Sequence, residues 1–291
     1  MGVGGAGVSG AGVSGAGVSG AGVSGNGILP NATPMLEVCV EDLHGIDTAI
    51  AGGAGRIELC AALAVGGLTP PASLIRAAVS ATAGRTGGPA LPVHLLARPR
   101  EGGFVYSRRE QALIADDIRT AAEAGLAGIV IGALDATHRL DLPVLVAWIA
   151  HARALGTARG HPLSLTLHRA FDLCADLPAA LEAAVSLGFD RILTSGGVPK
   201  AVDGVAMLGD LHRQAAGRIV ILAGSGVSPA TLPAILKSGV HEVHASCRVA
   251  SETATDPAEL RFGFAAAERS VTDRDTVDRL ARMIAGHLTL E

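Results

Sequence analysis

Short apolar runs alternate with amphipathic stretches along the chain from Met35 onward. Strands that alternate with helical segments form a parallel sheet, and a count of eight favours a closed (β/α)8 barrel of the TIM type. An open Rossmann-like sheet is the alternative, but Gly224-Ser225-Gly226 lacks the third glycine of its fingerprint and comes late in the chain. We therefore predict an α/β protein with a single barrel. The eight predicted strands are Leu36–Val40, Arg56–Cys60, Val93–Arg98, Gly128–Gly132, Leu163–His168, Arg191–Ser195, Ile219–Ala223 and Glu242–Ser246.

Capping signals mark several of the helices between these strands. Ser107 and Glu110 have the spacing of a capping box and predict a helix that follows them. Ser228-Pro229 predicts that a helix begins at Ala230 and continues to Lys237, with proline at the first helical turn. Beyond the last strand, the periodicity of Asp273–Leu288 predicts an extra C-terminal helix.

The first part of the chain follows a different pattern. Residues 2–27 contain the pentapeptide Ala-Gly-Val-Ser-Gly repeated four times. So much glycine raises the entropic cost of ordering, and the repeat has almost nothing to bury. We expect residues 1–34 to be a disordered tail and linker, and residues 35–291 to form the barrel domain.

Composition narrows the possible partners and the compartment. The net charge of −4 gives no reason to expect a nucleic acid or an anionic membrane as partner. No apolar run approaches the roughly 20 residues of a membrane helix. The four cysteines are widely scattered, as in reduced intracellular proteins, so we expect a cytoplasmic protein.

Strand parity separates the side chains that point into the barrel from those that face the helices. In the first, second, third, fifth and eighth predicted strands one parity is apolar and suits contact with helices. The other is polar, which is costly inside a barrel unless the groups are paired or functional. The deeper glutamates would serve equally well as buried partners of a histidine or arginine. The polar set is Glu37, Cys39, Glu58, Cys60, His94, Arg98, Thr166, His168, Thr194, Glu242, His244 and Ser246.

Cys39 and Cys60 end neighbouring strands on the same face. Adjacent strands lie about 4.8 Å apart, so two thiolates can approach each other there. Two soft sulfurs suit Cu(I), whereas zinc would need further ligands, which His168 or His94 would supply. The alternative is that each cysteine is simply a small buried hydrophobe. On the residues alone both interpretations stay open: Cys39 and Cys60 as ligands of a copper ion, or as two small buried hydrophobes.

The strand ends also carry groups suited to an anion and to acid–base chemistry. Barrels often bind phosphate in the loops after strands seven and eight, which here contribute Gly224, Gly226 and Ser246. Arg98 and Arg100 would add charge-assisted bonds to an anion. His168 beside Asp172 would act as a general acid or base, because imidazole titrates near neutrality. A tight glycine turn and a buried structural histidine are the plainer alternatives.

From about Met35 to the C-terminus the chain resembles the CutC family. The resemblance implies a TIM-type barrel, a cytoplasmic location, a role in copper homeostasis, and Cys39 and Cys60 as the Cu(I) ligands. Ala245 departs from the family pattern, in which a small hydroxyl residue often precedes Ser246, and this weakens the case for an anion site on the eighth strand. The segments that carry the resemblance are Glu37-Val38-Cys39, Arg56-Ile57-Glu58-Leu59-Cys60, Gly66-Gly67-Leu68-Thr69-Pro70, Arg98-Pro99-Arg100, Phe104-Val105-Tyr106-Ser107, His168-Arg169-Ala170-Phe171-Asp172, Leu193-Thr194-Ser195-Gly196 and Glu242-Val243-His244.

Two functional hypotheses follow. In the first, the protein binds Cu(I) through Cys39 and Cys60. In the second, it is a metal-independent enzyme for a small anionic or sugar-like substrate, with catalysis by His168, Asp172 and Arg98. The C-terminal helix would cover the barrel or meet a second subunit, which leaves a homo-oligomer as an open possibility.

Overall fold

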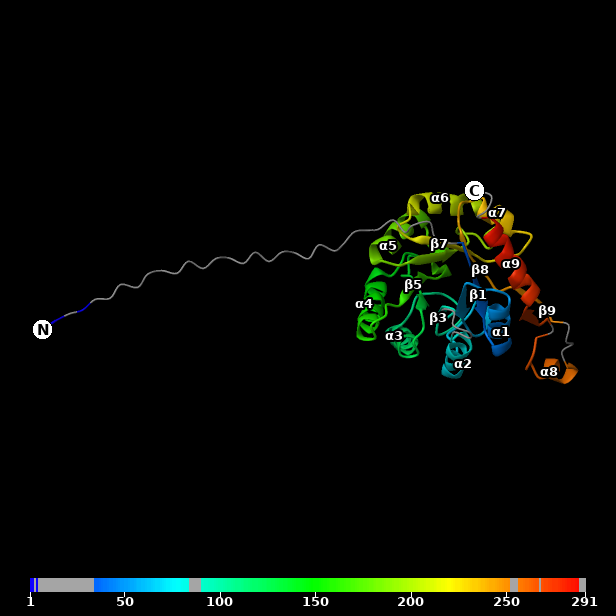
Figure 1. Ribbon diagram of the computed structural model, residues 1–291, viewed down its shortest axis with the longest axis horizontal. Coiled ribbons are helices and arrows are strands. Elements are labelled where there is room, and N and C mark those ends of the chain that lie inside the picture. Colours follow the sequence, from blue (N-terminus) through cyan, green and yellow to red (C-terminus); the bar gives the residue numbers. More distant parts are fainter. Residues whose placement is uncertain (3, 5–33, 84–89, 252–255, 267, 288–291) are drawn as a thin grey trace.

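Eight parallel strands close into a barrel in the order in which they occur in the chain, and this confirms the predicted architecture (Figure 1). The computed structural model describes residues 1, 2, 4, 34–83, 90–251, 256–266 and 268–287, so most of the predicted tail lies outside the described residues. The strands are β1 Met35–Val40, β2 Arg56–Leu59, β3 Val93–Leu96, β4 Gly128–Ile131, β5 Ser164–Leu167, β6 Arg191–Thr194, β7 Val220–Gly224 and β8 Glu242–Ala245.

Helices surround the barrel and cover the outer face of the strands (Figure 1). Their apolar sides pack against the outward parity of the strands, which forms the main hydrophobic core. No helix in the described part of the chain is long and apolar enough to cross a bilayer. The helices are α1 Leu43–Ala51, α2 Ala72–Thr82, α3 Arg108–Glu123, α4 Leu142–Ala158, α5 Leu177–Leu187, α6 Val205–Ala215, α7 Leu232–Leu236, α8 Pro257–Arg261 and α9 Arg274–His287, with short 3₁₀ turns η1 Leu63–Val65 and η2 Arg169–Leu173.

The predicted caps and boundaries are confirmed in part. Ser107 and Glu110 form the expected capping box at the start of α3. The helix predicted from Ala230 begins later, at Leu232. The reason is that Ser228 and Thr231 bond to each other's backbone N–H groups and hold the segment before α7 in a turn.

Most strands end one or two residues earlier than predicted, at the end of the barrel where the site lies. β5 ends at Leu167, and the side chain of His168 then accepts a hydrogen bond from the backbone of Ala170 as the cap of η2. β3 ends at Leu96, two residues before Arg98. These side chains therefore stand on the loops at the mouth of the barrel rather than on the sheet.

The two-stranded ribbon that precedes α9 was not predicted from the sequence. β9 Arg248–Ala250 pairs with β10 Ser270–Thr272 in an antiparallel ribbon that projects from the barrel together with α8 (Figure 1). The predicted C-terminal helix is confirmed as α9, which packs against β1 and α1 and buries Val277, Leu280 and Ile284. Strands of three residues carry too little periodicity to be found from sequence.

Candidate functional site

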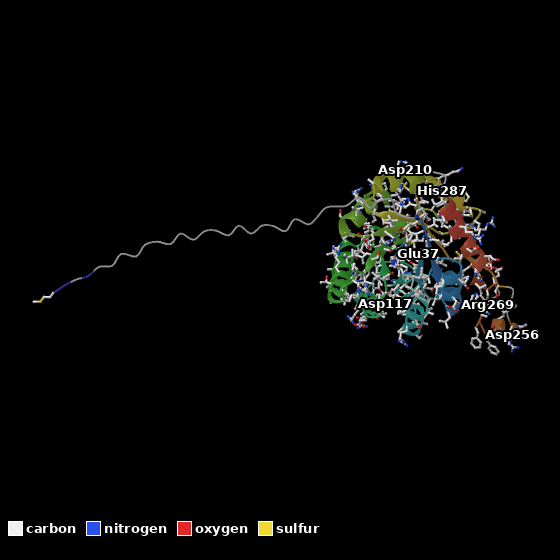
Figure 2. All side chains as sticks on the ribbon, viewed as in Figure 1. Glu37, Asp117, Asp210, Asp256, Arg269 and His287 are labelled. Carbon is white, nitrogen blue, oxygen red and sulfur yellow. The ribbon has the colours of Figure 1, made fainter. Side chains whose placement is uncertain are left out.

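The floor of the site is a buried network of carboxylates and arginines inside the barrel. Figure 2 shows Glu37 in the interior of the domain. Arg56, which is 1% exposed, donates from Nε to Glu37 at 2.5 Å and from Nη2 to Glu242 at 2.7 Å. Arg191 donates to the same oxygen of Glu242 at 3.0 Å. Two arginines and two glutamates thus neutralise one another inside the barrel, with only Arg191 partly exposed.

The charge state of Glu37 follows from these neighbours. Burial by itself raises the pKa of Glu37, but Arg56 and His244 lower it by more, so the pKa lies well below its usual value. Glu37 is therefore ionised at neutral pH and accepts bonds from both partners. The pKa of Arg56 is raised, because the attraction of Glu37 and Glu242 outweighs the effect of its burial.

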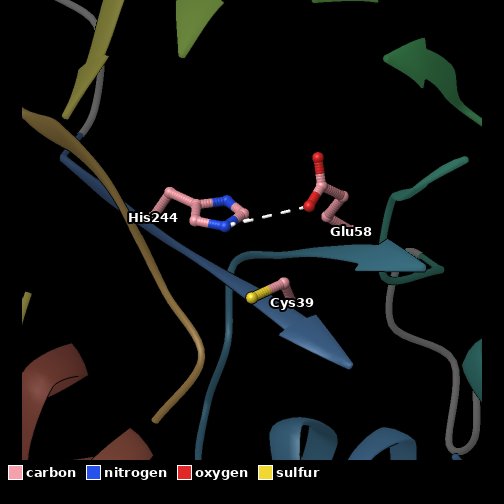
Figure 3. Close-up of side chains that lie close together, drawn as sticks. All are labelled: Cys39, Glu58 and His244. Carbon is pink, nitrogen blue, oxygen red and sulfur yellow. Dashed lines mark ion pairs between the residues drawn. The ribbon is translucent and has the colours of Figure 1, made fainter. Parts of the chain in front are cut away.

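Above this floor, His244 from β8 lies between two glutamates of β1 and β2. Its Nδ1 donates to Glu37 at 2.7 Å, and its Nε2 lies 3.8 Å from Glu58 Oε2. Burial lowers the pKa of His244, but Cys39, Glu58 and Glu37 raise it well above its ordinary value. Since Nδ1 is taken by Glu37, Nε2 is the nitrogen that faces Cys39 and Glu58 (Figure 3).

Cys39, Glu58 and His244 form a group of possible metal ligands. One ligand atom from each lies within 4.8 Å of the other two (Figure 3). They come from adjacent strands: the Cα of Cys39 pairs with that of Glu58, and the Cα of Glu37 pairs with that of His244. Parity had placed Glu58 and His244 in the lumen, but it did not identify them as companions of Cys39.

The second predicted ligand, Cys60, directly follows Leu59, the last residue of β2. Its thiol is fully buried and donates to Glu58 Oε2 at 3.3 Å. Burial and the nearby Glu58 raise the pKa of Cys60 well above its usual value. Cys39 and Cys60 belong to one small buried cluster with Leu96 and Val130. The structure thus brings both cysteines to the same region of the lumen, and Glu58 lies near both of them.

A cavity of about 460 Å³ opens above these residues at the barrel mouth. Arg98 forms part of its wall and donates to the carbonyls of Val65, Gly67 and Gly102 at 2.9–3.0 Å. The guanidinium also lies 5.2 Å from the centre of the Phe104 ring. Arg98 therefore ties the loops after β2 and β3 together, while its buried Nε has no hydrogen-bond partner within the described residues.

His168 is a second wall residue with a free donor. Its Nδ1 accepts a hydrogen bond from Ala170 N at 3.1 Å, so the ring proton is on Nε2. Nε2 has no partner among the described residues, and the ring centroid lies 4.8 Å from that of Phe104, with the two ring planes tilted by 44°. Burial, together with the charge of Arg98, lowers the pKa of His168 to about 3. His168 is therefore a neutral hydrogen-bond donor at physiological pH.

Asp172 does not pair with His168 but holds the next loop in place. It accepts bonds from Thr194 Oγ1 at 2.5 Å and from Ser195 N at 3.0 Å. It also accepts one from Arg169 Nε at 2.7 Å, and Arg169 lines the cavity. Through these bonds Asp172 holds Arg169 in place at the cavity.

Only some of the residues predicted for an anion site line the cavity. Gly226 and Ser246 line the cavity, whereas Gly224 ends β7. A Cβ at Gly224 would lie 2.5 Å from Leu193, so this glycine permits close packing between strands. Arg100 pairs with Glu110 and is not among the cavity-lining residues.

Comparisons with known proteins agree on one family. The sequence model of the CutC family matches residues 34–249. A family protein CutC from Sinorhizobium medicae is 47% identical over 82% of this chain and 91% of its own length. Another from Agrobacterium fabrum is 42% identical over 87% of this chain and 95% of its own.

Solved structures extend the comparison. A Streptococcus agalactiae protein named for copper homeostasis, CutC, superimposes with a TM-score of 0.66 at 28% identity, covering 73% of this chain and 98% of that one. Thiamine phosphate pyrophosphorylase from Pyrococcus furiosus reaches a TM-score of 0.52 at 12% identity, over 88% of this chain and 97% of that one. The second likeness reflects the shared barrel fold alone.

Proposed function

Because this chain belongs to the CutC family, we propose that it acts in copper homeostasis and holds Cu(I) at its barrel mouth through Cys39 and Cys60. The observation that supports the proposal is the small cluster in which both buried cysteines lie with Leu96 and Val130. Soft sulfur ligands in apolar surroundings favour Cu(I) over harder divalent ions.

Binding requires thiolates, so protons must leave the site. The Cys60 thiol already donates to Glu58. Burial is the main cause that raises the pKa of Glu58 above its usual value, which makes this carboxylate a suitable acceptor for a proton released by Cys60. Glu58 would then carry the proton while the sulfur binds the ion.

Cu(I) affinity should depend on the two barrel cysteines. In an anaerobic titration against a competing chelator, we expect one tight equivalent in the wild type. The Cys39→Ser/Cys60→Ser double variant should lose more than about 100-fold in affinity, beyond the 10–100-fold that an outer-shell partner contributes. Cys174→Ser is the matched control. Cys174 is half-buried at the end of η2 and does not line the cavity at the barrel mouth. Equal affinity of the double variant and the wild type would refute the copper proposal.

A second candidate function has its own support. The cavity has a volume of about 460 Å³, which is more than a single ion needs. Among the described residues, Arg98 Nε and His168 Nε2 in its walls have no hydrogen-bond partner, and Arg169 adds a positive charge. Buried donors without partners are rare in folded proteins and suit a ligand with acceptor oxygens. A barrel enzyme for a small anionic or sugar-like substrate would use His168 and Arg98, with Asp172 holding Arg169.

This second function predicts that the protein binds small oxyanions. Adding inorganic phosphate should shift the His168 ring signals in a nitrogen-15 NMR spectrum. Arg169→Gln should weaken that binding by roughly 10-fold or more, since a charge-assisted bond contributes about 1.5–3 kcal/mol. Arg218→Gln, which removes a surface arginine paired with Glu182, should leave it unchanged. Ring signals that do not respond to millimolar phosphate or to a small carboxylate would count against an anion site.

A further inference from the structure

We propose that Cys39, Glu58 and His244 form a three-ligand site for a divalent ion of the zinc type, with an open position that faces the cavity. This site rests on the proposed function only in one respect: it lies at the same barrel mouth and uses the same Cys39. Cys60 is not a ligand in this arrangement. The protein would therefore offer two overlapping donor sets, one with two sulfurs and one with sulfur, nitrogen and oxygen.

The spacing of the three donors fits a small ion. Zinc bond lengths of about 2.0–2.3 Å place tetrahedral donors roughly 3.3–3.6 Å apart. His244 Nε2 and Glu58 Oε2 lie 3.8 Å apart, and all three ligand atoms lie within 4.8 Å of one another. Closing by about 1 Å is within the reach of side-chain rotation on fixed strands. Because the three residues stand on adjacent strands of a closed barrel, the backbone already holds them in place.

The chemistry of the donors selects the ion. One thiolate, one imidazole and one carboxylate are a mixed set that suits a borderline divalent ion such as Zn²⁺. Cu(I) has little use for a carboxylate, and Mg²⁺ or Ca²⁺ would want oxygen ligands throughout. The thiolate and the carboxylate together also balance the two positive charges of the ion. The protons that these donors carry would leave to solvent as the ion binds, so the loaded site would be neutral.

Residues around the ligands complete the site. Metal-binding histidines usually donate their other ring N–H to a carboxylate, which fixes the ring and strengthens the ligand. His244 does so, since its Nδ1 donates to Glu37 at 2.7 Å. Arg56 in turn holds Glu37 at 2.5 Å and Glu242 at 2.7 Å. Glu37 is therefore a positioning residue, and its buried network presents Nε2 toward Cys39 and Glu58.

The fourth position would lie toward the cavity. Zinc sites with three protein ligands keep the remaining position for water or substrate. Cys39, Glu58 and His244 all belong to the wall of the 460 Å³ cavity, which also contains Arg98, His168 and Arg169. An oxygen of a small carboxylate or phosphate would reach the ion while its other oxygens meet these donors. The ligand class that fits is therefore a small oxyanion bound to the metal.

Cobalt titration tests this site, because Co²⁺ takes zinc positions and reports its ligands in its absorption spectrum. Chelator-treated, tag-free, full-length protein should develop a thiolate-to-cobalt band in the near ultraviolet, and Zn²⁺ should abolish it. Cys39→Ser should remove the band, and Cys60→Ser should keep it. Glu37→Gln should keep the band but weaken affinity by roughly 10–100-fold. Glu182→Gln, at a surface pair with Arg218, is the matched carboxylate control and should change nothing.

The outcomes separate this site from the proposed copper function. If Cys60→Ser keeps the cobalt band but loses Cu(I) affinity, the result supports both the three-ligand site and the copper proposal. A cobalt band without tight Cu(I) binding refutes the copper proposal alone. If wild type shows no thiolate band, or if Cys60→Ser removes it as fully as Cys39→Ser, the three-ligand site is overturned. X-ray absorption of zinc-loaded wild type needs no variant: one sulfur with nitrogen and oxygen ligands is expected, and two sulfurs would overturn it.

Discussion

Replacing Arg56 by methionine is expected to lower the free energy of unfolding by about 3–5 kcal/mol, the usual cost of removing one partner from a buried ion pair. Arg56 is 1% exposed and is bonded to both Glu37 and Glu242. Without it, two carboxylates would remain in the lumen with fewer partners. Chemical denaturation at pH 7 measures the loss.

Two further variants show whether charge is the cause. Arg218→Met breaks a surface pair with Glu182 and should cost no more than about 1 kcal/mol. Adding Glu37→Gln to Arg56→Met should recover part of the lost stability, because one of the two carboxylates left without Arg56 is then uncharged, while Glu242 still pairs with Arg191. If Arg56→Met were as stable as wild type, the ion network would not be a main support of the barrel floor.

Acidification from pH 6.5 towards pH 4 should destabilise the protein through its buried histidines. Burial, with Arg98 nearby, lowers the pKa of His168 to about 3, and burial, with Arg56 nearby, lowers that of His94 to about 3. The unfolded histidines titrate near 6.5, so below that pH the unfolded chain binds more protons than the folded one. Each histidine should therefore remove about 1 kcal/mol of stability for every pH unit of acidification.

Urea denaturation at several pH values between 7 and 4.5 tests this linkage. His168→Gln should make the decline with falling pH shallower by about one proton's contribution, close to 1 kcal/mol per pH unit. His161→Gln is the control, because His161 lies exposed on the surface. Glu37, whose pKa is lowered in the fold, adds a loss in the same direction at lower pH. Identical pH profiles for wild type and His168→Gln would show that His168 does not enter the folded state neutral.

The sequence contained enough to predict the barrel and the composition of its interior. The alternation of eight apolar runs with helical segments predicted the closed parallel sheet that the structure shows. Period-two parity also separated the buried polar residues, such as Glu37, Glu58 and His94, from the apolar face that meets the helices. These predictions succeed because the direction of a strand side chain is a local property of the backbone.

Which polar groups meet was decided only by the tertiary structure. Closure of the barrel places β8 beside β1, so that His244 reaches Glu37 across 207 positions of the chain. The register sets Cys39 opposite Glu58 rather than opposite Cys60. The loops likewise supply the donors of Asp172, and within the described part of the chain they leave His168 Nε2 without a hydrogen-bond partner. Register, closure and loop packing depend on contacts between distant segments, and a local pattern of residues does not specify such contacts.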